Sequence, residues 1–266
     1  MSLPLILGLV VGVILALTGA GGGILAVPLL VFGAGIGVAQ AGPIGLLAVG
    51  MAAALGAMLG LKAGTVRYRA ALLISGVGMA FAPLGLWLAH RIDNRALSVL
   101  FALVLLYVAA RNARQALGRT PLVASAPARA RPCVRDAASG RFIWTSACAR
   151  SLALSGSVAG LLSGLLGVGG GFVMVPALQR STDLAMQSIV ATSLAVIALV
   201  SMSGVTATAL AGAMDWGVAL PFSAGALAGM LGGRALAARL AGPHLQLGFA
   251  VVSALVAAGM IAKAAS

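Results

Sequence analysis

Two glycine clusters of the same pattern are the residues of this chain best suited to holding a charged ligand. Gly-Ala-Gly-Gly-Gly at 19–23 is followed by Pro28, and Gly-Val-Gly-Gly-Gly at 167–171 is followed by Pro176. Adjacent glycines allow positive φ angles and weaken a helix, and proline lacks a backbone N–H. A helix that restarts after such a break presents free N–H groups and the positive end of its dipole, so each cluster predicts an anion site.

The two clusters belong to an internal repeat. At the same offset of 148 positions, Gly8 corresponds to Gly156 and Phe101 to Phe249. Each copy therefore interrupts its first apolar segment at the same place. In a membrane protein, interrupted helices at matching positions of two halves indicate a transport site near the middle of the bilayer.

The elements that must position these clusters are membrane helices. The chain is 61% hydrophobic and 8% charged, whereas about a quarter of the residues of a soluble domain are charged. The segments 3–18 and 151–166 start the two halves. The other apolar runs approach or exceed the length that crosses a bilayer: 42–61, 70–90, 97–117, 188–211, 218–233 and 245–262. We predict an all-α polytopic membrane protein of about eight transmembrane helices, a duplication of two four-helix halves with the first helix of each half broken.

Three regions are predicted along the chain: a first transmembrane half at 1–118, an Arg/Ala/Pro-rich linker at 119–150 and a second half at 151–266. The net charge is +13 and the basic residues lie between apolar runs. Such a distribution is typical of cytoplasmic loops, so we expect no nucleic-acid partner. The linker is placed in the cytoplasm, where Cys133 and Cys148 are expected to be free, reduced thiols.

The orientation of the two halves depends on whether each interrupted element crosses the membrane or turns back. If it crosses, the halves are parallel, with twelve Lys or Arg inside and five outside; if it returns, they are inverted, with fourteen inside and three outside. The excess of basic residues on the cytoplasmic side therefore favours the inverted arrangement by a margin of two residues.

The lack of acidic and histidine side chains in the predicted spans limits the kinds of ligand that the protein could bind. The chain has no Glu, and its four Asp and two His residues lie in or beside predicted loops. Cation and proton pathways usually place carboxylates within the spans, so an anion is the favoured ligand. We predict no metal, no cofactor and no catalytic residue, because an intramembrane enzyme would need a paired nucleophile and base inside the spans.

Hydroxyl and amide side chains near the second cluster complete the predicted site, and half one has Ile44 and Gly45 where half two has a Thr-Ser pair. The predicted substrate-binding set is Thr18, Gly19, Gly21, Gly22, Gly23, Pro28, Gly167, Gly169, Gly170, Gly171, Pro176, Gln187, Thr192 and Ser193. Lys62, Arg67 and Arg69 flank Tyr68 and are expected to anchor the interface. Alternatively, they form a vestibule that gathers anions.

These motifs resemble the TauE/SafE family of membrane permeases, the sulfite exporter or 4-toluene sulfonate uptake permease family. The resemblance rests on the doubled Gly-x-Gly-Gly-Gly-(x)₄-Pro, on 191–194 (Ala-Thr-Ser-Leu), and on glycines four residues before Tyr68 and Trp216. It implies a multi-pass transporter in a bacterial inner membrane that carries sulfite or related sulfonates. The alternatives are a permease for another small anion, such as a carboxylate, and a non-transporting scaffold acting through the basic linker. A coupling proton or ion, the direction of transport and the oligomeric state are left open.

Overall fold

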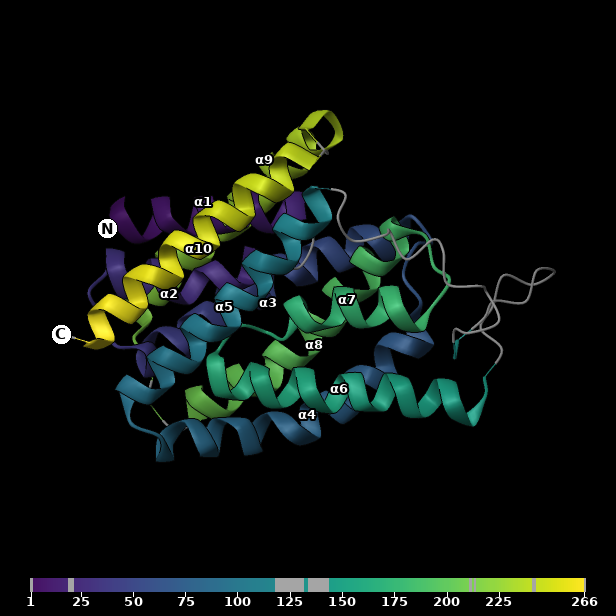
Figure 1. The fold of residues 1–266 in the computed structure, drawn as a ribbon, viewed down its shortest axis with the longest axis horizontal. Coiled ribbons are helices and arrows are strands. Elements are labelled where there is room, and N and C mark those ends of the chain that lie inside the picture. Colours follow the sequence, from purple (N-terminus) through teal and green to yellow (C-terminus); the bar gives the residue numbers. More distant parts are fainter. Residues whose placement is uncertain are drawn as a thin grey trace.

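The computed structural model describes residues 2–18, 22–117, 132–133, 144–210, 212, 214–240 and 243–265. Within these residues the chain folds into ten α-helices and one 3-10 helix (Figure 1). The elements are α1 (Ser2–Thr18), η1 (Gly22–Leu25), α2 (Ala26–Gly33), α3 (Val38–Lys62), α4 (Tyr68–Arg91), α5 (Asn94–Ala116), α6 (Ser146–Leu166), α7 (Gly171–Ser181), α8 (Met186–Leu210), α9 (Trp216–Leu240) and α10 (Pro243–Ala265).

Six of the described helices, namely α3, α4, α5, α6, α8 and α9, are long and apolar enough to cross a membrane. Shorter apolar stretches lie in α1 (Leu3–Leu17) and α10 (Leu247–Ala262). Large apolar side chains such as Leu154 and Leu255 point outward, each 68% exposed. In lipid a helix satisfies its own backbone groups, so these apolar runs fold as predicted, and the prediction of an all-α polytopic membrane protein is confirmed.

Glycines bring two helix pairs into backbone contact. A Cβ on Gly156 of α6 would lie 2.6 Å from the Ile74 carbonyl oxygen of α4, and one on Gly160 would meet the Gly78 carbonyl. On α1, Gly8 and Gly12 meet α9 in the same way, at Phe222 and Ala226. Small residues allow such close packing in membranes. Residue numbers rise together in both pairs, so α6 runs parallel to α4 and α1 parallel to α9.

Helices α3 and α8 pack against each other in the interior, in opposite directions. A Cβ on Gly50 would lie 2.8 Å from the Ser201 Cβ, whereas one on Gly60, ten residues further along α3, would lie 3.0 Å from the Ala191 Cβ, ten residues back along α8. About half or more of each helix is buried. This pair therefore forms the framework on which the short helices rest.

Each short helix turns back along the helix before it. Gly22 approaches the backbone of Leu15, and Gly33 at the end of α2 approaches the side chain of Leu7. Similarly, Gly170 lies against Ala159, and the Ser151 hydroxyl near the start of α6 donates to the Ser181 hydroxyl at the end of α7 over 3.2 Å. Both α1–α2 and α6–α7 are therefore antiparallel hairpins.

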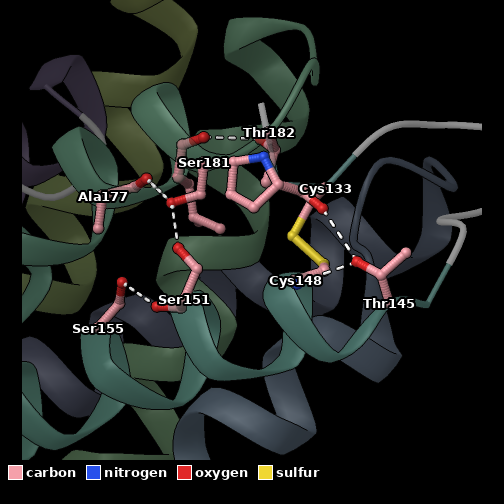
Figure 2. Close-up of a disulfide and its surroundings, with 10 residues drawn as sticks. Cys133, Thr145, Cys148, Ser151, Ser155, Ala177, Ser181 and Thr182 are labelled. Carbon is pink, nitrogen blue, oxygen red and sulfur yellow. Dashed lines mark hydrogen bonds between the residues drawn. A yellow bond between two sulfur atoms is a disulfide. The ribbon is translucent and has the colours of Figure 1, made fainter. Parts of the chain in front are cut away.

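The expectation of two free thiols was wrong. Cys133 and Cys148 form a disulfide with their Cα atoms 4.8 Å apart (Figure 2). Thr145 accepts a hydrogen bond from the Cys148 backbone N–H and caps α6, which therefore begins at Ser146, inside the predicted linker. The Cys133 N–H donates to the Ser181 carbonyl. The disulfide thus ties Cys133 to α6, and the backbone hydrogen bond ties it to the end of α7. The spacing of the two cysteines did not predict the disulfide, because the position of Cys133 depends on its contact with Ser181 at the end of α7.

Reducing the disulfide is expected to lower the free energy of unfolding by about 3 kcal/mol, the chain-entropy value for a loop of this size, since the cysteines are 15 positions apart. Thermal unfolding of the purified protein with and without dithiothreitol measures the difference. A Cys133→Ser/Cys148→Ser double variant is the control and should not respond to the reductant. Equal melting temperatures for oxidised and fully reduced wild type would contradict the prediction.

Candidate functional site

The second glycine cluster lies between two helix ends. Gly167 is the left-handed C-cap of α6 (φ 69°), and its N–H donates to the Ser163 carbonyl. Gly169 (φ 73°) and Gly170 (φ 66°) are also left-handed, and Gly170 is the N-cap of α7 without a side-chain capping bond. The first N–H groups of a helix have no acceptor one turn earlier. In α7 the Val173 N–H donates to the Gly170 carbonyl over 3.1 Å, so the backbone donors at this break are the N–H groups of Gly171 and Phe172.

The first cluster differs from the second. Gly22 and Gly23 are buried in the 3-10 turn η1, which leads directly into α2, and Pro28 is buried in the first turn of α2. Gly19, Gly21 and the side chain of Thr18 lie outside the described residues. Pro176 is half-buried within α7, where its missing N–H leaves the carbonyl of Phe172 without the usual helix donor.

The two breaks meet. A Cβ on Gly23 would lie 3.2 Å from the Val168 carbonyl oxygen, and the Val49 side chain of α3 touches both sites, 3.0 Å from that position and 3.8 Å from the corresponding position of Gly169. Gly42 and Gly45 of α3 also pack against Gly167. Residues about 145 positions apart in sequence are thereby brought together around α3.

Backbone groups and hydroxyls supply the polarity of the interior. Among the described residues every buried polar side chain is Ser or Thr. One of them, Ser201 of α8, lies beside Gly169 and was not among the predicted site residues. Comparing the two halves could have found it, because half two has a polar residue, Ser201, where half one has Ala53.

The structure places Gln187, Thr192 and Ser193 away from the two breaks. Gln187 is exposed on the first turn of α8, and the Ser193 hydroxyl donates to the Ile189 carbonyl of its own helix over 2.8 Å, which is a frequent arrangement for serine in helices. Thr192 precedes Ser201 by nine residues, about 13.5 Å along the helix axis.

Thr192 instead belongs to a second polar cluster at the end of the molecule where α8 begins. Its hydroxyl oxygen accepts the Arg67 backbone N–H over 3.1 Å. Arg67, which precedes α4, is half-buried, and its Nε is buried without a hydrogen-bond partner. A guanidinium N–H in that state is a donor available to an anion. The predicted anion-gathering vestibule thus has one well-defined candidate.

If the protein transports an anion, replacing Arg67 with Gln is expected to lower the flux about tenfold, because a fixed positive charge at this end of the molecule raises the local concentration of anions. The measurement is initial uptake rate at low ionic strength. Arg69→Gln is the matched control: Arg69 is exposed and lies 5.9 Å from the centroid of the Tyr68 ring. If Arg67→Gln and Arg69→Gln have equal uptake rates, Arg67 does not gather anions and serves only the packing of α4 on α8.

A small cavity of about 30 Å³ approaches the second break from the end of the molecule that carries the α4–α5 turn. Its lining includes Gly42, Leu86, Leu97 and Gly167. This volume holds about two water molecules. The cavity therefore extends from this end of the protein to Gly167 of the second break.

The fold defines a multi-pass, all-helical membrane protein whose interior polar groups come from backbone breaks and hydroxyls. The chain belongs to the sulfite exporter TauE/SafE family, whose model matches residues 4–260. It is 32% identical over 243 residues to a probable membrane transporter protein of Xylella fastidiosa (strain 9a5c), covering 90% of this chain and 85% of that one. It is also 28% identical over 231 residues to the probable membrane transporter protein YunE of Bacillus subtilis (strain 168), covering 83% and 82%. No solved structure matches the chain. The protein is therefore a membrane transporter, and the resemblance seen in the sequence is confirmed.

Proposed function

We propose that the protein is a secondary permease for small anions, with sulfur oxyanions such as sulfite or small organosulfonates as the leading substrates. The observation that carries this proposal is the meeting of the two glycine breaks in an interior whose described buried polar side chains are all Ser or Thr. Helix N-termini and hydroxyls donate hydrogen bonds to an anion, and a cation would find no carboxylate among the described buried side chains. The substrate class comes from the family description.

We also infer that the two halves are inverted copies. Helix α1 is parallel to α9, and α9 follows α8 through a short turn, so α1 runs opposite to α8 and along α3. Helix α6 is parallel to α4, which follows α3 through a short turn, so α6 runs opposite to α3. Corresponding helices α1 and α6 therefore point in opposite directions. Rocking of one inverted half against the other would give alternating access at the breaks.

The orientation in the membrane follows from charge. The inverted arrangement assigns fourteen of the 17 Lys and Arg residues of the sequence to the side of the membrane that faces the α5–α6 segment, which predicts that this side is cytoplasmic. The Cys133–Cys148 disulfide lies on the same side, although disulfides are typical of oxidising compartments. The charge distribution and the disulfide thus point to opposite orientations. Labelling a cysteine introduced at Ser266, in a variant without the two native cysteines, distinguishes between them. Periplasmic labelling supports the charge-based orientation in a bacterial inner membrane.

The function is tested by uptake into proteoliposomes. The panel is sulfite, sulfate, sulfoacetate, phosphate and small carboxylates, each with and without an imposed proton gradient. Saturable flux of sulfite or sulfoacetate supports the proposal, and a response to the gradient identifies proton coupling. If only a carboxylate is transported, the substrate class is a carboxylate and not a sulfur oxyanion. If properly folded protein transports no anion, the proposed permease function is overturned.

A further inference from the structure

The hydroxyl of Ser201 has no hydrogen-bond partner, although the side chain is 1% exposed. Other serine and threonine hydroxyls of the same helix donate to a carbonyl one turn earlier, as Ser193 does to Ile189 and Thr208 to Gly204. Buried polar groups without partners are rare and need an explanation. Ser201 therefore carries an unused donor in the interior of the protein.

That donor faces the second glycine break. The Ser201 Oγ lies 3.0 Å from the position that a Cβ on Gly169 would occupy, and only Gly170 separates Gly169 from the start of α7. Because Gly169 has a φ of 73° and no side chain, nothing at that residue covers the hydroxyl. Helix α7 has 11 residues and no side-chain cap. A ligand at its N-terminus would lie next to both the helix N–H groups and the Ser201 hydroxyl.

The described residues of the other half offer no equivalent. Ala53 occupies the corresponding position of α3, and half one restarts through the 3-10 turn η1 rather than through an α-helix with a glycine N-cap. A symmetric pair of helix ends would hold an anion between the halves. The unequal donors instead favour the α7 side.

We infer that Ser201 is a substrate-binding residue, its hydroxyl and the α7 N-terminus together forming an asymmetric oxyanion site on half two. The inference rests on the proposed permease function and adds which half binds the anion and through which side chain. In the present conformation Gly50 of α3 packs against Ser201, with 2.8 Å between its Cβ position and the Ser201 Cβ. The hydroxyl becomes accessible when α3 and α8 separate.

Ser201→Ala is expected to raise the KM for the transported sulfur oxyanion about tenfold, which corresponds to the loss of one hydrogen bond to a charged group. The maximal rate should change less than the KM. Ser253→Ala is the matched control, because Ser253 on α10 is also fully buried with an unpartnered hydroxyl but lies on the helix that packs against α5. Its KM should equal that of wild type.

Direct binding provides a second readout that is independent of flux. Wild type and Ser253→Ala should be stabilised by added sulfite in a thermal-shift titration, and Ser201→Ala should need about tenfold more sulfite for the same shift. Ser201→Cys, which keeps the shape but donates weakly, should fall between them. If wild type transports sulfite and either folded Ser201 variant has a wild-type KM, the assignment of Ser201 is overturned and the permease function stands. If wild type transports no anion, the proposed function itself fails.

Discussion

Replacing Gly170 with Val is expected to lower anion flux by at least about tenfold while the protein still inserts into the membrane. Gly170 is the N-cap of α7 with a φ of 66°, and a Cβ there would lie 2.6 Å from the Ala159 carbonyl oxygen. A left-handed β-branched residue costs about 1–2 kcal/mol, and the carbonyl belongs to the backbone of α6 and has little freedom to move. The α7 N-terminus must therefore shift, which would remove hydrogen bonds to the proposed anion.

The control for Gly170→Val must carry the same backbone strain without the steric contact. Gly35 meets this requirement, because its φ is 68° and nothing lies within 4 Å of its Cβ position. Gly35→Val should retain most of the wild-type flux, measured as initial uptake rate per reconstituted protein. Gly22→Val is the companion variant in half one, since Gly22 approaches the backbone of Leu15. Normal flux in both Gly170→Val and Gly22→Val would show that the glycine breaks are not the transport site.

Replacing Gly160 with Leu is expected to lower the free energy of unfolding by about 3 kcal/mol, the upper end of the usual cost of overpacking. A side chain at Gly160 would enter the Gly78 backbone, so α6 and α4 could not approach as they do. Their separation would also displace Gly156, which packs on Ile74 in the same seam. The melting temperature and the monodisperse fraction in detergent measure the effect.

A glycine of the same helix pair gives the matched comparison. Gly76 of α4 has nothing within 4 Å of its Cβ position, so Gly76→Leu should leave the melting temperature close to that of wild type. Because leucine is also a better helix former than glycine, a small rise would be consistent with this expectation. A melting temperature for Gly160→Leu equal to that of Gly76→Leu would show that the close α4–α6 contact is not needed for stability.

The positions of the helices could be predicted closely from the sequence. The run predicted at 42–61 is α3 (Val38–Lys62), and the run at 188–211 is α8 (Met186–Leu210). The agreement has a simple cause: a backbone inside lipid must satisfy its own hydrogen bonds, so an apolar run becomes a helix wherever it is long enough. Gly167, Gly169 and Gly170, all with positive φ, lie between α6 and α7, where glycine weakens the helical hydrogen-bond pattern. Pro28 and Pro176, in contrast, lie within α2 and α7.

The partners of each helix were not predictable in this way. The apolar runs are hydrophobic on all sides, so their periodicity does not select which face meets which neighbour, and the contacts of Gly156 with Ile74 and of Gly50 with Ser201 depend on complementary shapes far apart in the chain. Thr192 and Ser193 were included in the predicted site because they are near the second cluster along the chain. In three dimensions Ser193 bonds to its own helix and Thr192 to the Arg67 N–H.

By itself, then, the sequence determined that the protein lies in a membrane, where its helices are and to which family it belongs, because each of these follows from local composition or from a motif. The internal repeat and the anionic ligand stay predictions. Only the tertiary structure decided that the short helices turn back, that Gly23 reaches Val168, that Cys133 and Cys148 are joined, and that the Ser201 hydroxyl faces Gly169. Each of these facts is a contact between distant segments, and the apolar pattern of the sequence does not determine which segments meet. In a membrane the packing of small residues, rather than hydrophobicity, distinguishes them.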